Sequence, residues 1–257
     1  MSVIRLHWSA SKNNFGDVLS PLIVERVSSR PVIYESIEKA DLVAIGSLLQ
    51  RLKESFWSRR LHVWGSGFIS PERPRQTRHY IHAVRGLETA SILKKEDEGI
   101  AIGDPGLLVG LLRDQLNLKR DRFPLVVVPH YQDKDSEALR HFLALNPSAI
   151  QLDIQADPLT ILEVIGSARL VVSSAMHGLI AADGLGVPNV RARFSDRLRG
   201  GDFKFQDYYS AFKIGMPDVT PLAEITDAMM EEYVDGYARP GLDDVLQNLI
   251  AAFPRAF

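Results

Sequence analysis

Short apolar runs alternate with longer helix-like segments along most of the chain. The short runs are rich in β-branched residues and nearly continuous in hydrophobicity, which is typical of strands buried on both faces of a parallel sheet. The pattern predicts ten strands, at residues 3–6, 31–34, 42–45, 61–64, 79–84, 99–102, 125–128, 149–153, 170–173 and 187–192. It predicts eight helices, at residues 17–28, 87–95, 105–113, 136–144, 158–167, 179–185 and about 221–235 and 242–252.

Strand–helix alternation of this kind indicates an α/β protein whose parallel sheets are covered by helices on both faces. The alternation breaks at residues 116–124, where charged residues interrupt the pattern and Pro124 precedes a new strand. We therefore predict two Rossmann-like lobes facing a cleft, the N-terminal lobe at residues 1–120 and the C-terminal lobe at 121–240. A C-terminal helix is expected at 241–257.

Composition narrows the function classes. The 257 residues are 46% hydrophobic and 24% charged, as in ordinary globular proteins. No cysteine is present, which excludes disulfides and thiolate chemistry. A formal net charge of −2 argues against a nucleic-acid partner, because such proteins are usually basic. The first residues do not resemble a secretory signal, and no uncharged apolar stretch is long enough to span a bilayer, so we expect a cytoplasmic protein.

In open α/β sheets, ligands bind beyond the carboxyl ends of the strands, so residues that directly follow predicted strands are the first candidates. Asn14, Gly16 and Asp17 follow the first strand and open a helix. Gly16 gives the backbone freedom, and Asp17 is expected to cap the helix and face the cleft; a plain cap and turn is the alternative. The segments "IGSLL" at 45–49 and "VWGSGF" at 63–68 also place glycines directly after a strand. Neither segment is a dinucleotide fingerprint.

Two further side chains stand at strand ends. Arg85 precedes Gly86 and a helix, where a guanidinium suits a carboxylate or phosphate ligand. By contrast, the cations between residues 73 and 78 are expected on a solvated face. His130 also follows a strand directly, and it is either a structural histidine or a side chain at the cleft edge.

His177 gives the strongest local signal, because it lies where the strand "RLVVSS" ends and a small-residue run predicted to be helical follows. An imidazole has an ordinary pKa of about 6.5 and exchanges protons at neutral pH. The helix offers free amide N–H groups to an anion beside the ring. Ser173 and Ser174 add hydroxyls on the same turn, and Gly178 follows. A core histidine beside a tight turn is the alternative.

The segment from 191 to 204 is basic. It contains Arg191, Arg193, Arg197, Arg199 and Lys204 against two aspartates, a local excess of +3. The Gly200–Gly201 pair predicts a mobile loop that closes over an anionic ligand. Aromatics at Phe203, Phe205, Tyr208 and Tyr209 would then stack on a sugar or shield the site. A plain surface loop with a small apolar cluster is the competing interpretation.

Four motifs in this order resemble the polysaccharide pyruvyl transferase family: "NNFGD", "AVRG", "GDPGLL" and "SSAMHGLIAADGLGVPNV". The later "GGDFKFQDYY" is similar to the branch that contains bacterial exopolysaccharide ketal-pyruvate transferases. The resemblance spans residues 13 to 210. It implies a fold akin to GT-B glycosyltransferases and transfer of pyruvate from phosphoenolpyruvate to two hydroxyls of a hexose in an exopolysaccharide or its lipid-linked precursor, giving a cyclic ketal.

On this resemblance His177 is the acid or phosphate partner, Arg85 clamps the donor, and Asp17 or His130 assists the acceptor hydroxyl. Many members carry an arginine two residues before the histidine, where this chain has Ala175. Donor anchoring is thereby left to Arg85 and the basic loop. The predicted substrate-binding residues are Asn14, Gly16, Arg85, Ser173, Ser174, Gly178, Arg197, Arg199 and Lys204.

The alternatives are a nucleotide-sugar glycosyltransferase on the same architecture and a non-catalytic anion- or glycan-binding relative. No cofactor other than the donor substrate is expected, and no metal, because no Asp/His cluster has metal-ligand spacing. A lipid-linked acceptor would bring the protein to the inner face of the cell membrane. The C-terminal "VLQNLIAAFPRAF" would then dock there, or else form an ordinary core-facing helix.

Overall fold

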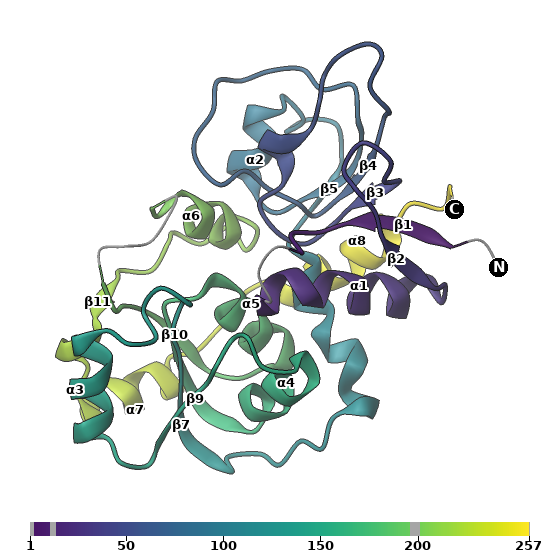
Figure 1. Ribbon diagram of the computed structural model, residues 1–257. Helices are drawn as coiled ribbons and strands as arrows, with labels where there is room; N and C mark the ends of the chain where they lie inside the picture. Colours follow the sequence, from purple (N-terminus) through teal and green to yellow (C-terminus); the bar gives the residue numbers. More distant parts are fainter. Residues whose placement is uncertain (1–2, 11–13, 196–200, 257) are drawn as a thin grey trace.

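The computed structural model describes residues 3–10, 14–195 and 201–256, which form two lobes, each built on a parallel sheet (Figure 1). The N-terminal sheet has the order β2-β1-β3-β4-β5-β6, with β1 at Ile4–His7, β2 at Val32–Tyr34, β3 at Leu42–Val43, β4 at His62–Trp64, β5 at Tyr80–Val84 and β6 at Ala101–Ile102. The C-terminal sheet has the order β11-β10-β9-β7-β8, with β7 at Phe123–Val128, β8 at Ala149–Gln151, β9 at Ala168–Ser173, β10 at Asn189–Arg193 and β11 at Thr220–Pro221. The α/β class with two parallel sheets is confirmed.

Helices cover both sheets, and all of the α-helices except α6 lie close to the predicted positions. The α-helices are α1 at Phe15–Ser28, α2 at Leu87–Ile92, α3 at Glu137–Leu145, α4 at Pro158–Gly166, α5 at Met176–Leu185, α6 at Phe203–Ser210, α7 at Asp227–Asp235 and α8 at Leu242–Ala251. Short 3-10 segments lie at Leu49–Arg51 (η1), Pro105–Gln115 (η2) and Leu222–Glu224 (η3). The segment η2 was predicted as an α-helix. It carries Gly106 and Gly110, which disfavour an α-helix, and a Cβ atom at Gly110 would lie 3.1 Å from the carbonyl oxygen of Gly184 in α5.

The two lobes share one apolar core. A single cluster of buried side chains includes Leu6 and Leu42 of the N-terminal sheet and Val126 and Val171 of the C-terminal sheet. The helix α5 connects them, since eight of its ten residues are buried. Because this core is continuous, residues that follow strands in either lobe are held at fixed positions relative to each other.

The segment after β10 differs from the prediction. Residues 196–200, which include Arg197 and Arg199, lie outside the described residues, and the chain then forms α6 instead of a continuing loop. Phe205, Tyr208 and Tyr209 are at most 1% exposed and belong to the core. The expectation that these three rings stack on a sugar is therefore wrong, because packing between the lobes already covers them.

Helix α6 joins the two lobes, and Figure 1 shows it between α2 and the C-terminal sheet. Towards the N-terminal lobe, Asp207 forms an ion pair with Arg85 at the end of β5. Towards the C-terminal lobe, the hydroxyl of Tyr208 donates to Asp183 of α5 at 2.5 Å. Adjacent residues of one short helix thus connect both halves of the molecule.

The chain returns to the N-terminal lobe at its end. Val245 and Leu249 of α8 are buried, and the indole Nε1 of Trp64 donates to the carbonyl of Leu249 at 2.8 Å. Phe253 packs edge-on against the same indole, with ring centroids 4.9 Å apart. Of the two interpretations of this segment, the core-facing helix is the one observed, at the side of β6. Across the described residues, no helix is long and apolar enough to cross a membrane.

Candidate active site

A pocket of about 170 Å³ opens between the lobes at the carboxyl ends of strands from both sheets. Residues 14–17 follow β1 and residues 46–48 follow β3, and both segments line it from the N-terminal lobe. His130, which follows β7, and residues 175–178, which follow β9, line it from the C-terminal lobe. The strand-end rule therefore located the pocket correctly.

His177 lies in the first turn of α5, two residues after the helix N-cap Ala175. Its ring lies against Gly16 of α1, where a Cβ atom would come within 1.9 Å of the imidazole Nδ1. Glycine at position 16 is therefore required for the ring to occupy this place, and no larger residue fits without displacing it. The histidine side chain is 14% exposed, through the pocket.

Asp104 stands behind the ring and was not predicted. Its Oδ2 lies 3.9 Å from Nε2 of His177, and neither buried atom has a hydrogen-bond partner among the described residues. Burial raises the pKa of Asp104 to about 6, although the backbone N–H of Gly106 donates to Oδ1 at 2.8 Å. One feature of the sequence could have identified Asp104: it is the second residue of "GDPGLL", the motif that directly follows the strand predicted at 99–102.

Burial and neighbouring positive charges lower the pKa values of Lys204 and His177 in the pocket. Lys204 of α6 lines it, and no carboxylate in the described ranges forms an ion pair with its ammonium group. Burial, together with the charges of Arg85 and Arg191, lowers the pKa of Lys204 to about 8. Burial, then Lys204 and Arg85, lowers the pKa of His177 to about 3. In the protein alone the imidazole is therefore neutral at pH 7, whereas the ammonium group of Lys204, which lines the same pocket, is mostly charged.

On the opposite wall, Asp17 lies in the first turn of α1 and faces the pocket. It does not cap the helix as predicted, because the N-cap is Asn14, whose Nδ2 donates to Oδ2 of Asp17 at 3.3 Å. Burial raises the pKa of Asp17 to about 6, while the nearby charge of Arg51 lowers it. Arg51, which sequence reasoning missed, is exposed and also lines the pocket.

Comparisons with known proteins identify the family of the chain. A family model described as polysaccharide pyruvyl transferase matches residues 4–191. The chain belongs to this family. The chain is also similar to the "Uncharacterized protein L143" of Acanthamoeba polyphaga mimivirus, with 28% identity over 216 residues that cover 82% of this chain and 75% of that protein. The family match includes Asp17, Asp104 and His177 but ends before α6, so Lys204 lies outside it.

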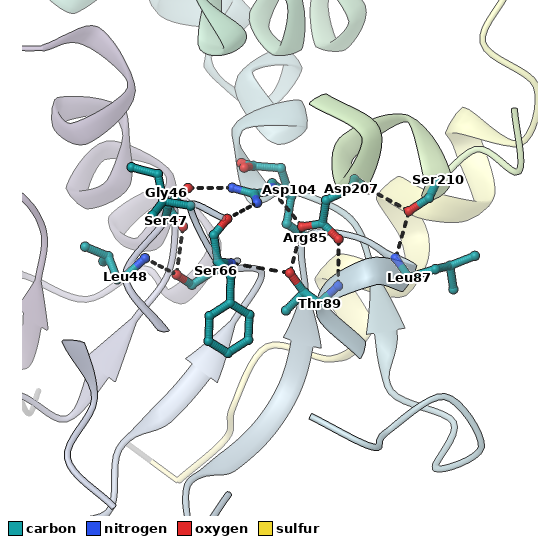
Figure 2. Close-up of polar contacts among 12 residues, drawn as sticks. Gly46, Ser47, Leu48, Ser66, Arg85, Leu87, Thr89, Asp104, Asp207 and Ser210 are labelled. Carbon is teal, nitrogen blue, oxygen red and sulfur yellow. Dashed lines mark hydrogen bonds and ion pairs between the residues drawn. The ribbon is translucent and has the colours of Figure 1, made fainter. Parts of the chain in front are cut away.

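In this polysaccharide pyruvyl transferase family member, Arg85 does not lie in the pocket, where we expected it to bind the donor. The side chain is fully buried and does not line the pocket. Figure 2 shows its guanidinium between three partners: Nε donates to Asp207 at 2.9 Å, Nη1 to Ser47 at 2.7 Å, and Nη2 to the carbonyl of Phe68. Gly67 makes room for it, since a Cβ atom there would lie 2.6 Å from the guanidinium carbon.

The "AVRG" motif instead connects α6 to α2, because Asp207 of α6 binds both Arg85 and the first turn of α2. Asp207 accepts hydrogen bonds from the backbone N–H of Thr89 at 2.8 Å and from its hydroxyl at 2.7 Å, in the first turn of α2. A Cβ atom at Gly86 would lie 1.7 Å from the carbonyl oxygen of Asp207, so only glycine allows this approach. Because Lys204 is on the same short helix, we assign Arg85 as a positioning residue for Lys204.

Ser173 and Ser174 are fully buried and do not line the pocket. The hydroxyl of Ser173 lies 2.9 Å from the carbonyl of Val128, and that of Ser174 donates to Asp133 at 2.8 Å while accepting from the N–H of His130 at 2.9 Å. We therefore assign both hydroxyls to the support of the turn and not to substrate contact.

Ala175 lines the pocket, at the position where the resemblance leads us to expect an arginine. Lys204 lines the same pocket from α6, and Arg51 lines it from η1. Both side chains bring positive charge to the pocket. Throughout the described segments, no three His, Asp or Glu side chains gather as a metal site requires, and the absence of a metal stays a prediction.

Proposed function

We propose that this family member transfers pyruvate from phosphoenolpyruvate to two hydroxyls of a hexose, forming a cyclic ketal. The observation that carries the proposal is the pocket between the lobes, which both the imidazole of His177 and the side chain of Lys204 line. Phosphoenolpyruvate carries a carboxylate and a phosphate, so it suits a site with two cations and a helix N-terminus, the first turn of α5. Membership of the polysaccharide pyruvyl transferase family supports a saccharide as the acceptor.

The reaction adds a proton to the methylene carbon of phosphoenolpyruvate, and cationic character develops at C2. One sugar hydroxyl adds to C2 and gives up its proton. The bond between C2 and the phosphate oxygen then breaks, and phosphate leaves with the electron pair. The second hydroxyl adds to C2, loses its proton and closes the ketal. The protein must therefore supply one acid, a base for the hydroxyls and positive charge for the leaving phosphate.

His177 fits the role of acid or phosphate partner because the donor itself would change its protonation. A phosphate dianion beside the ring favours the imidazolium form and raises the pKa of His177 from about 3. Asp104, whose Oδ2 lies behind Nε2, would stabilise the proton that the ring gains. We infer that the proton used in the reaction reaches the ring when the donor binds.

Asp17 fits the role of base. Its pKa of about 6 leaves it mostly ionised at neutral pH yet close enough to the working pH to accept a proton from a sugar hydroxyl. It lines the same pocket as His177, from the first turn of α1. His130 lines the same pocket and is the second candidate.

A thermal-shift comparison tests the donor class. Phosphoenolpyruvate is expected to raise the melting temperature, because a ligand that binds only the native state stabilises it, whereas UDP and UDP-sugars are expected to have no effect. Stabilisation by UDP-sugars without any by phosphoenolpyruvate would contradict the proposal and favour a nucleotide-sugar glycosyltransferase.

Lys204 makes a separate, pH-dependent prediction. Its ammonium group loses its proton as pH rises through about 8, so kcat/KM for phosphoenolpyruvate, which reports the free enzyme, should fall above that pH. Lys204→Arg should remove this fall, because a guanidinium stays charged. Lys204→Met should lower kcat/KM at pH 7 by about 10- to 100-fold, the effect of losing a hydrogen bond to a charged group. The exposed Lys213→Met is the matched control, and equal values for the two Met variants would remove Lys204 from donor binding.

A further inference from the structure

Two large aromatic side chains protrude from the N-terminal lobe. Phe56 is 81% exposed and Trp57 is 91% exposed, in the loop between η1 and β4. The rings contact each other edge to face, with centroids 5.4 Å apart. By contrast, Trp64 is fully buried and Trp8 is half-buried. Leaving two adjacent rings in water is unfavourable, which indicates that something covers them.

Cationic side chains surround the pair. The guanidinium carbon of Arg78 lies 5.8 Å from the ring centroid of Phe56, and that of Arg60 lies 3.9 Å from Tyr80, which is itself 43% exposed. These five residues form a surface that we call the basic aromatic face: Phe56, Trp57, Arg60, Arg78 and Tyr80.

The charge of this face opposes that of the whole chain. Residues 52–60 and 72–80 contain six Lys and Arg against two Glu, a net charge of +4, whereas the chain carries −2. Glu38 and Asp41 from neighbouring segments pair with Lys53 and Arg59. No carboxylate within the described ranges forms an ion pair with Arg60 or Arg78, the two arginines of the basic aromatic face.

None of the residues of the basic aromatic face lines the pocket. Its two loops precede β4 and β5, so they lie at the amino ends of these strands, whereas the pocket lies at the carboxyl ends. Figure 1 shows the loop that precedes β4, in dark blue, at the end of the N-terminal lobe away from the C-terminal lobe. A partner bound there would leave the pocket open.

We propose that the basic aromatic face docks on an anionic lipid bilayer. Tryptophan and phenylalanine partition into the interface between headgroups and acyl chains, and arginines bind the phosphates of anionic headgroups. A neutral glycan is disfavoured, because the only carboxylate of loop 52–60, Glu54, already accepts from the hydroxyl of Thr77 and the N–H of Arg78. This proposal does not depend on the identity of the donor, and it places membrane contact away from α8.

Vesicle binding tests it. The full chain should co-sediment with phosphatidylcholine vesicles that contain phosphatidylglycerol and not with pure phosphatidylcholine, and added salt should weaken binding. The emission of Trp57 should shift to shorter wavelength on binding. The Trp57→Phe variant should still bind the vesicles but should show little of this emission shift. That result would identify Trp57 as the tryptophan that inserts into the bilayer.

The double variant Phe56→Ser/Trp57→Ser should reduce vesicle binding by about tenfold or more. Its urea unfolding midpoint should equal that of the unmodified protein, which shows that it folds. Leu145→Ser is the matched control, because Leu145 is 67% exposed on the C-terminal lobe. Unchanged vesicle binding by the double variant would overturn the proposal, as would equal binding to neutral vesicles. A concentration-dependent dimer that the double variant loses, without vesicle binding, would instead assign the face to a second copy of the chain.

Discussion

Replacing His177 with alanine is expected to lower kcat for phosphate release from phosphoenolpyruvate by about 100- to 10,000-fold, the usual contribution of a positioned acid or base. The ring is the titratable group at the N-terminus of α5, and Gly16 and Asp104 surround it on two sides. The variant removes the side chain that would carry the proton. The assay uses a hexose-terminated acceptor and follows inorganic phosphate.

The matched control for this variant is His141→Ala, because His141 is exposed on α3 and does not line the pocket. Its kcat should equal that of the unmodified protein. If His177→Ala turns over at the same rate as His141→Ala, the imidazole has no chemical role, and the proposed mechanism fails at its first step.

Replacing Arg85 with methionine is expected to lower the free energy of unfolding by about 3–5 kcal/mol, the usual cost of breaking a buried ion pair from one side. Arg85 and Asp207 are both fully buried, with Nε and Oδ2 at 2.9 Å, and the variant leaves a carboxylate without its cation. Urea unfolding measures the change. Because Asp207 holds the helix that carries Lys204, the variant should also raise KM for phosphoenolpyruvate.

Two controls make this result specific. The double variant Arg85→Met/Asp207→Leu removes the uncompensated charge and should recover part of the lost stability. The exposed Arg73→Met should change the free energy of unfolding by no more than about 0.5 kcal/mol. An Arg85→Met protein with the urea midpoint of Arg73→Met would contradict the assignment of Arg85 as a positioning residue.

The sheets could be predicted from the sequence because their strands are short, apolar and separated by helices. The strand-end rule then brought Asp17, His130 and His177 to one pocket, although they are far apart in the chain. This succeeded because parallel strands in one sheet present their carboxyl ends at the same edge. The positions of the strands, and the pocket at their carboxyl ends, thus follow from the local hydrophobic pattern of the sequence.

The partners of buried charges could not be predicted in the same way. Arg85 does stand at a strand end, but its guanidinium is bound by Asp207, 122 residues later in the chain. Helix α6 itself follows a run of glycines and charges that predicts a loop, and packing between the lobes overrides that preference. Asp104 was missed because a carboxylate before Pro105 is also typical of a helix cap, a role it fills through Gly106.

The protonation of His177 measured by ¹⁵N NMR tests the central claim most directly. At about pH 6 the ring should be neutral in the protein alone, because its pKa there is about 3, and it should carry a second proton once phosphoenolpyruvate is bound. The His177→Ala spectrum assigns the signal. Saturating phosphoenolpyruvate that leaves the ring neutral and its nitrogen shifts unchanged would contradict the placement of a phosphorylated acid beside His177.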